Sequence, residues 1–339
     1  MISPAEDATW FRIDDRAGDG RVRRAAVALA GHLGFSEART AEVAIVATEL
    51  TTNIARHAGG GAIAVRRLSS ASGAAPGGLA LLAVDDGQGM ADPAARAVDG
   101  ESTGGSLGIG LGAVQRLAPG AQIYSVLGRG TVIEVAMSPS GCTVEPDHAA
   151  ALARPMTNEE VCGDAYLVAS EGPRRVVVLA DGLGHGPLAA VASQAAIQVA
   201  IEKPEADPAA MIADMHRRIR HSRGAAVAVA EIDLENATVA FAGVGNVSAW
   251  VTHHEGRRGM PSQPGIVGEG SIKSIRHTVY PLMPGAVVVL HSDGLTDKWD
   301  LTSYPGLRTR PPIVMAAVLM RDAGTRHDDA SVVVTDTTR

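Results

Sequence analysis

Four aspartates in the second half of the sequence have the residue type and the positions needed to hold metal ions. The apolar segment Val176–Ala180 ends at Asp181, and a second apolar segment leads to Asp293. Asp164 and Asp328 stand next to further segments of strand character. Carboxylates gathered at strand ends would repel one another and raise one another's pKa. Because divalent cations bound by oxygen ligands relieve that repulsion, the pattern predicts a pair of metal ions.

Other polar residues in this half have two interpretations each. We expect Asp297 and Asp329 to be solvated or to lie behind the ligands rather than to bind metal. His185 follows Asp181 in a glycine-rich turn, where it can position a phosphate or cap the turn equally well. The basic run Met215–Gly224 can dock an acidic or phosphorylated partner, but a solvated helix end is the favoured interpretation.

The first half of the chain contains a helix pattern that carries a carboxylate and an amide. In residues 41–58, apolar side chains from Val43 to Ile54 recur at helical spacing and predict a buried stripe. Glu49 and Asn53 are four residues apart, so they share a face beside that stripe. The pair could hold a hydrated Mg²⁺ and orient a nucleophile, although the pair alone is better explained as a solvated helix face.

A second motif of the first half follows a strand pattern. The segment 77–85 is apolar and ends at Asp85, and Gly87 and Gly89 come directly after it. A carboxylate at that point can accept a hydrogen bond from an exocyclic amine, and glycines let the backbone approach a ligand closely. When the motif is taken alone, an ordinary Asp-Gly turn is the favoured interpretation.

Two further glycine motifs complete the first half. Gly108 and Gly110 precede an apparent helix, where backbone N–H groups and the helix dipole suit a phosphate. Gly130 and Thr131 stand at the start of another strand pattern. Residues 91–107 lie before the first of these motifs, and we expect them to form a mobile lid over a nucleotide pocket.

The order of the four motifs of the first half resembles the ATP-binding boxes of the GHKL ATPase/kinase superfamily, over residues 10–138. The resemblance implies that Asn53 binds Mg²⁺, that Asp85 contacts adenine, and that Gly108 and Gly110 close over the phosphates of ATP, with Glu49 as candidate general base. Among GHKL proteins, the segments ATELTTNIARHA and SLGIGLGAVQRL look like the anti-sigma-factor serine kinases of the RsbT type. Those kinases phosphorylate a serine or threonine of a STAS-domain partner.

The second half, residues 148–337, resembles the SpoIIE/RsbX-like branch of the PPM superfamily of metal-dependent Ser/Thr phosphatases. The segments GD, ADGLGHG, SDG and DD carry the resemblance. It implies that two Mn²⁺ or Mg²⁺ ions activate the water that attacks a phosphoserine or phosphothreonine. The implied ligands, with Asp181 as the catalytic carboxylate, are Asp164, Asp181, the Gly182 carbonyl, Asp293 and Asp328. PPM enzymes of eukaryotic type carry a phosphate-binding arginine just before the first aspartate, and Arg154 stands too far upstream for us to assign that role.

The patterns and both resemblances predict an α/β protein of two domains. Residues 1–138 are expected to form a GHKL two-layer α/β sandwich with a mixed sheet. Residues 139–150 are expected to be a linker, because they fall in a stretch rich in Pro, Gly, Ser and acidic residues. Residues 151–339 are expected to form a PPM-type α/β/β/α sandwich whose metals lie at one edge of two stacked sheets.

The composition excludes several classes of function. The formal net charge is −7 and aromatic residues make up 3% of the chain. Neither favours binding to nucleic acid or to an anionic membrane surface. Two cysteines are too few for a disulfide framework, and we find neither a signal-peptide pattern nor an uninterrupted apolar span. We therefore expect a cytoplasmic protein, and the sequence leaves its oligomeric state open.

The combined interpretation is a bacterial partner-switching regulator. Its first domain would use ATP to phosphorylate a serine or threonine of a STAS-type antagonist or scaffold protein, and its second domain would remove that phosphate, in control of a sigma factor or stress response. One alternative is a phosphatase whose first domain only senses ATP. The other is a binding module whose first domain sequesters a sigma factor.

Overall fold

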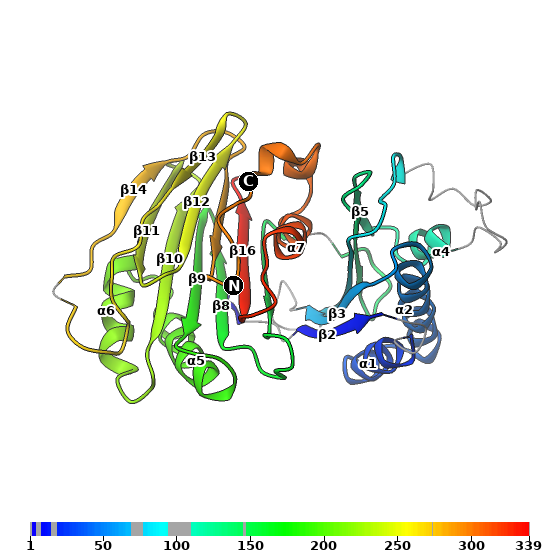
Figure 1. Ribbon diagram of the computed structural model, residues 1–339, viewed down its shortest axis with the longest axis horizontal. Coiled ribbons are helices and arrows are strands. Elements are labelled where there is room, and N and C mark those ends of the chain that lie inside the picture. Colours follow the sequence, from blue (N-terminus) through cyan, green and yellow to red (C-terminus); the bar gives the residue numbers. More distant parts are fainter. Residues whose placement is uncertain are drawn as a thin grey trace. The chain divides into compact units, whose positions relative to one another are not determined.

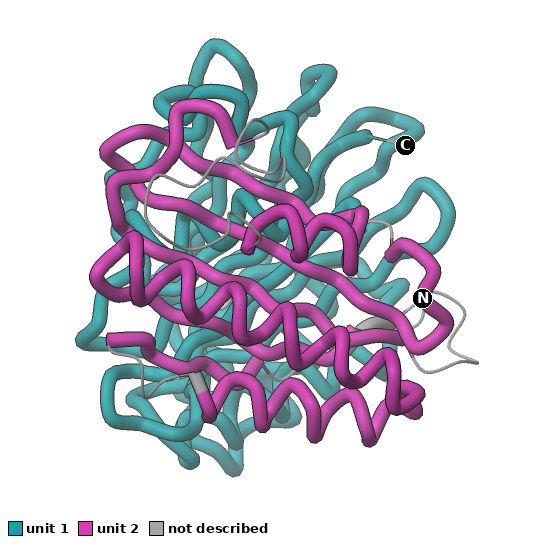
Figure 2. The backbone as a smooth tube through the Cα atoms, turned by 90° about the vertical axis from the view of Figure 1, so that its right-hand side faces the viewer, with its two compact units in different colours: residues 1–5, 147–339 teal, residues 6–146 magenta. Residues whose placement is uncertain are grey.

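The computed structural model describes two compact units, which Figure 2 shows in different colours. One unit comprises residues 6–146, and the other comprises residues 1–5 together with 147–339. The described residues are 2–4, 8–14, 19–68, 77–93, 110–144, 147–272 and 274–338.

The unit of residues 6–146 consists of one sheet covered by helices on one face. The sheet has the strand order β2-β3-β4-β6-β5. Three helices, α1, α2 and α4, contribute to its core together with the sheet. The helices are α1 (Asp19–His32), α2 (Glu37–His57) and α4 (Gly110–Leu117). The strands are β2 (Ala8–Ile13), β3 (Gly61–Leu68), β4 (Gly78–Asp85), β5 (Gln122–Ser125) and β6 (Thr131–Met137).

The expected two-layer α/β sandwich is confirmed for this unit, but the expectation of a mixed sheet is wrong for the described strands. Every hydrogen-bonded pair among them is antiparallel. The chain passes through α4 between β4 and β5, so these two strands run in the same direction, as a crossover through a helix allows. β6 lies between them and is antiparallel to both, which removes the parallel pairing.

Helix α2 forms where the apolar periodicity predicted it. Ser36 caps its N-terminus by accepting a hydrogen bond from the Arg39 backbone N–H at 3.2 Å. Val43, Leu50 and Ile54 are buried and belong to the hydrophobic core under the sheet. The buried stripe fixes the rotation of the helix about its axis and therefore fixes the side on which its polar residues stand.

The second unit is a four-layer sandwich with two antiparallel sheets at its centre (Figure 1). The first sheet has the order β1-β8-β9-β10-β11-β14 and packs against α5 and α6. The second has the order β13-β12-β15-β16-β7 and packs against α7. This is the expected α/β/β/α arrangement.

The elements of this unit have the following bounds. The first sheet comprises β1 (Ile2–Pro4), β8 (Asp164–Glu171), β9 (Arg174–Gly182), β10 (Ala225–Asp233), β11 (Thr238–Val244) and β14 (Thr278–Pro281). The second comprises β7 (Ala149–Arg154), β12 (Ser248–His253), β13 (Gly256–Gly259), β15 (Val287–His291) and β16 (Ala330–Asp336). The helices are α5 (Pro187–Glu202), α6 (Pro208–Arg218), α7 (Pro312–Asp322) and the short 3₁₀ turns η2 (Leu301–Ser303) and η3 (Leu307–Thr309).

The two sheets are held together by side chains that alternate along their strands. Val177 and Leu179 of β9 point into the space between the sheets and meet Leu290 and Val333 of the opposite sheet in one core cluster. The intervening residue, Val178, belongs instead to the cluster shared with α5 and α6. Because β9 is buried on both faces, it reads in sequence as a continuous apolar run.

The structure divides the chain at different residues from those expected. Ile2–Pro4 pair with residues 167–169 of β8, so the first strand completes the sheet of the second unit. β7 begins at Ala149, inside the segment 139–150 that we interpreted as a linker. Both differences involve edge strands. An edge strand pairs with a free sheet edge formed by distant residues, and the local sequence does not show which edge that is.

Among the described residues, no helix is both long enough and apolar enough to cross a membrane.

Replacing Phe241 with alanine should weaken the core between the sheets. Phe241 is 2% exposed on β11, and removing such a ring typically costs about 3–5 kcal/mol. In the full chain, hydrogen exchange of the β10 and β11 amides should report a loss of that size. Val279→Ala on the neighbouring β14, where the side chain is 55% exposed, is the control and should cost less than about 0.5 kcal/mol. Equal losses for the two variants would contradict the described core.

Candidate active sites

The aspartates of the predicted metal site come from both sheets of the sandwich. Asp164 begins β8 and lies directly opposite Asp181 of β9 in the antiparallel register. Asp293 follows the end of β15, and Asp328 lies two residues before β16, the neighbour of β15 in the second sheet. Two strand pairs, one from each sheet, therefore deliver these carboxylates.

The carboxylates are close enough to change one another's protonation. Burial first, and then the charges of Asp164, Asp293 and Asp328, raise the pKa of Asp181 to about 9. Burial likewise raises the pKa of Asp164 to about 7, against the opposing effect of the Ser292 hydroxyl. The pKa of Asp293 is raised by burial and then by Asp328. The cluster thus carries more negative charge than its surroundings compensate.

The donor chemistry of this cluster fits a hard divalent cation. The Asp164 side chain is buried, and its Oδ2 atom has no hydrogen-bond partner. Burial without a partner is costly for a carboxylate oxygen unless a cation compensates it. Within the described ranges, no three acidic, histidine or cysteine side chains stand close enough together to form a ready ligand set. The carboxylates influence one another's pKa, but they are not yet at the distances of ligands to one ion. Metal binding here would release protons, because the ligands must be ionised.

Asn246 contacts this cluster, and sequence reasoning gave it no role. Its Nδ2 donates a short hydrogen bond to Asp293 Oδ2 and so orients that carboxylate. Asn246 lies in the turn between β11 and β12, after Gly245, which adopts a φ of +100°. The segment FAGVGNVSAW contains the signal, a glycine pair and an amide at the end of a strand, but only the fold brings it to Asp293.

Asp329 and Asp297 hold the backbone and neighbouring side chains. Asp329 is 3% exposed, and its two oxygens accept hydrogen bonds from the backbone N–H groups of Met156 and Gly163, each at 2.8 Å. Asp297 accepts a hydrogen bond from Trp250 Nε1 at 3.1 Å. Both carboxylates are engaged in these contacts, as expected for residues that support the site from outside it.

The turn after Asp181 is packed closely at its start and open further along. A side chain at Gly182 would overlap the backbone carbonyl of Ala189, so only glycine fits there. His185, farther along the turn, is exposed, and its Nδ1 lies 3.0 Å from Oε1 of Glu159. Arg154, which we left unassigned, donates to the Thr325 carbonyl at 2.6 Å.

In the other unit, Asp85 joins two of the four nucleotide motifs. Its Oδ1 accepts hydrogen bonds from the backbone N–H of Gly87 at 2.9 Å and from that of Thr131 at 3.2 Å. The register places Asp85 of β4 opposite Thr131 of β6. The strand-end carboxylate and the start of β6 therefore form one corner of this unit.

Glycines allow the backbone to close around this corner. Gly89 and Gly130 adopt φ values of +65° and +78°, which side chains other than glycine rarely adopt. A Cβ at Gly130 would overlap the carbonyl of Asp85, and one at Gly89 would overlap that of Val126. These glycines are thus required for the packing of the backbone, whatever ligand they approach.

Glu49 and Asn53 of α2 face the first described residue of α4. An ideal Cβ on Gly110 would lie 3.0 Å from Glu49 Oε2 and 3.3 Å from Asn53 Oδ1. Both side chains are half-buried, and both stand beside the buried stripe of α2. The structure brings these three predicted residues together. Gly108 and most of the expected lid at 91–107 lie outside the described residues.

Comparison with known proteins assigns a different family to each of the two units. Residues 17–137 match the family model of the histidine kinase-like ATPase domain, and residues 171–338 match that of the Stage II sporulation protein E (SpoIIE) family. The serine/threonine-protein kinase RsbT of Bacillus subtilis is 36% identical over 106 residues, which is 31% of this chain and 77% of RsbT.

Two further relatives resemble the chain. The phosphoserine phosphatase RsbX of Bacillus subtilis is 24% identical over 153 residues, which is 44% of this chain and 77% of RsbX. A solved structure described as "The bacterial stressosome: a modular system that has been adapted to control secondary messenger signaling" is 25% identical, with a TM-score of 0.52 over 55% of this chain and 97% of that one. The chain therefore belongs to the histidine kinase-like ATPase family in its first part and to the SpoIIE family in its second, and it joins an RsbT-like domain to an RsbX-like domain.

Proposed function

We propose that this protein is a bifunctional partner-switching regulator that adds and removes phosphate on a serine or threonine of a STAS-domain protein. The observation that carries the proposal is the carboxylate cluster at the strand ends of a SpoIIE-family domain, joined in one chain to an RsbT-like ATPase domain. The names of its relatives support opposite activities, a kinase for the first domain and a phosphoserine phosphatase for the second.

In the phosphatase reaction, Asp164, Asp181, Asp293, Asp328 and the Gly182 carbonyl would hold two Mn²⁺ or Mg²⁺ ions. When bound, two such ions supply an activated water and neutralise the phosphoryl oxygens. The residues of the chain fix the geometry. Antiparallel pairing sets Asp164 opposite Asp181, and Asn246 orients Asp293.

In the kinase reaction, ATP would lie between the Asp85 corner and the N-terminal side of α4. Asp85 would accept a hydrogen bond from the adenine amine, and Gly87, Gly89, Gly130 and Thr131 would shape the corner around the base. Asn53 would bind the Mg²⁺ of ATP, and Gly108 and Gly110 would contact the phosphates. Glu49 would accept the proton of the attacking hydroxyl. The position of Gly110 beside Glu49 and Asn53 supports this arrangement.

Separate inactivation of the two sites tests the bifunctional proposal. With ATP, Mn²⁺ and a STAS-domain substrate, Asp181→Ala should raise the steady-state phosphorylation of the substrate, because removal stops while addition continues. Asn53→Ala should lower it for the converse reason. Phosphate on the substrate is read by intact-protein mass spectrometry.

The same experiment separates the alternatives. A protein whose first domain only senses ATP would show no phosphorylation with Asp181→Ala, and a binding module would show no change with either variant. Asp214→Ala, which removes the ion pairs of Asp214 with Arg217 and Lys203, away from both sites, is the control for the preparation of the protein.

Asn246→Ala should slow phosphate release without unfolding the domain. Asp293 would lose the donor that orients it, and removal of such an orienting partner typically costs about 10–100-fold in metal affinity or activity. Asn236→Ala is the matched control, because Asn236 donates to Asp233 in an exposed turn between β10 and β11. Release of phosphate is measured over a range of Mn²⁺ concentrations. Equal rates for the two variants would show that Asn246 does not contribute to the site.

A further inference from the structure

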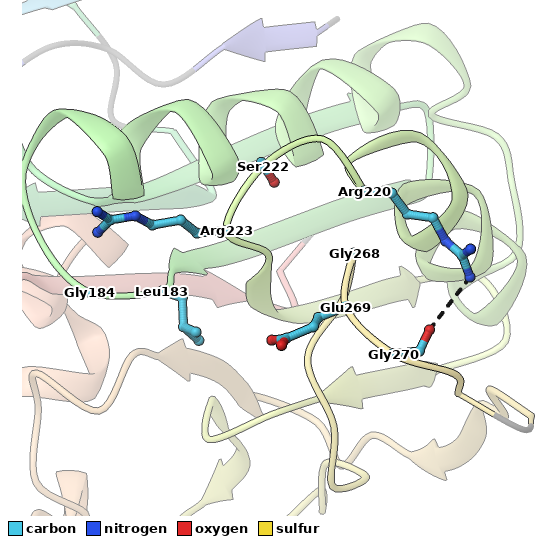
Figure 3. A pocket seen from close by; sticks show the side chains of 8 residues that line it. All are labelled: Leu183, Gly184, Arg220, Ser222, Arg223, Gly268, Glu269 and Gly270. Carbon is cyan, nitrogen blue, oxygen red and sulfur yellow. Dashed lines mark hydrogen bonds between the residues drawn. The ribbon is translucent and has the colours of Figure 1, made fainter.

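A cavity of about 620 Å³ opens beside the turn that follows Asp181 (Figure 3). Two of its lining residues, Leu183 and Gly184, belong to that turn. Gly184 is three residues from Asp181, so their Cα atoms are at most about 11 Å apart. A peptide bound at the carboxylate cluster would therefore need only a few residues to extend to the cavity. Its lining residues are Leu183, Gly184, Arg220, Ser222, Arg223, Gly268, Glu269 and Gly270.

The walls of this cavity are held by backbone contacts on both sides. Leu183 N–H donates to the Gly224 carbonyl at 3.0 Å, which fastens the turn to the segment that leads into β10. Ala225 and Val267 exchange backbone hydrogen bonds of 2.9 Å, which fastens the same segment to the loop that carries Glu269. The cavity is thus formed before any ligand binds.

Arg223 presents an uncompensated positive charge in this cavity. Its Nη1 lies 3.3 Å from the position that a Cβ on Gly184 would occupy, so the guanidinium lies against the turn. It forms no hydrogen bond or ion pair with any residue in the described part of the chain. Ser222 fixes its backbone by donating to the Ile219 carbonyl at 2.6 Å and accepting from Gly224 N–H at 3.1 Å.

The other arginines of this basic run already have partners. Arg217 pairs with Asp214 at 2.9 Å, and Arg218 pairs with Glu202 at 2.6 Å. Arg220 lines the cavity but donates to the Gly270 carbonyl at 3.5 Å, as Figure 3 shows. The run is thus a solvated, ion-paired helix end over most of its length, as we expected, with Arg223 as the exception.

We infer that this cavity is a substrate subsite in which Arg223 pairs with an acidic side chain of the phosphoprotein, within about three residues of the phosphoserine. This inference rests on the proposed phosphatase function. An extended chain advances about 3.3–3.6 Å per residue, so a phosphoserine at the carboxylate cluster places its near neighbours over the cavity. The half-exposed Leu183 offers an apolar contact beside the charge.

The charges of the cavity select the ligand. Arg220 and Arg223 against Glu269 leave one net positive charge, which favours a carboxylate over an ammonium group. A guanidinium binds a carboxylate with two parallel hydrogen bonds, and such charged bonds are stronger than neutral ones. Arg223 is therefore a residue that sets substrate preference.

Peptide substrates test the subsite in the full-length protein with Mn²⁺. Phosphoserine peptides carrying Glu or Gln at each of the three positions on either side are compared with p-nitrophenyl phosphate. The wild type should prefer Glu to Gln at one position by about tenfold in kcat/KM, as a charge-assisted hydrogen bond allows. Arg223→Ala should abolish that preference while its turnover of p-nitrophenyl phosphate stays within about twofold, since this substrate has no neighbouring side chain to place in the cavity.

Two further variants sharpen the result. Arg223→Glu should prefer Lys at the position where the wild type prefers Glu, which a merely structural role would not produce. Arg217→Ala, in the same run but outside the cavity, should retain the preference of the wild type.

The outcomes distinguish failure of the subsite from failure of the phosphatase. A wild type that hydrolyses the peptides without preferring Glu overturns the subsite and leaves the phosphatase intact. An equal fall in p-nitrophenyl phosphate turnover with Arg223→Ala also overturns it, because Arg223 would then hold the phosphate itself. A wild type that hydrolyses none of the substrates overturns the phosphatase and the subsite together.

Discussion

Repulsion between buried carboxylates is the constraint on which the catalytic half of this protein depends. Asp164 and Asp181 face each other across one strand pair, and the other sheet adds Asp293 and Asp328 at the same cluster. Their raised pKa values mean that the fold alone does not compensate these charges. The sandwich tolerates them because its two apolar cores hold the sheets in place, and that packing keeps the carboxylates together despite their repulsion.

Much of the fold followed from periodicity, because strands buried on both faces and an amphipathic helix leave direct patterns in sequence. β9 and α2 were predicted for that reason. The site was harder to predict from the sequence. The role of Asn246 depends on a contact between segments distant in the chain, because Asn246 meets Asp293 across 47 positions. The mixed-sheet expectation failed because the pattern does not tell which strand is inserted between β4 and β5.

The same physical device recurs in both units. At Gly182 and at Gly130, a missing side chain lets one segment of backbone lie against another, beside a strand-end aspartate. At the Gly130 corner, the backbone N–H groups of Gly87 and Thr131 donate to Asp85 and so fix the direction of its carboxylate. Opposite activities in one chain would consume ATP without net change unless one is favoured, so nucleotide, partner binding or the arrangement of the domains must select between them.

The most direct test of the account is phosphate release from a phosphoserine STAS-domain protein with Mn²⁺, with and without ATP, by the wild type and by Asp181→Ala. We expect release by the wild type and its loss in the variant under both conditions. A dependence of the wild-type rate on ATP would identify the first domain as a regulator of the second. Absence of release from the wild type, or undiminished release from Asp181→Ala, would contradict the central claim that the aspartate cluster is a phosphatase centre.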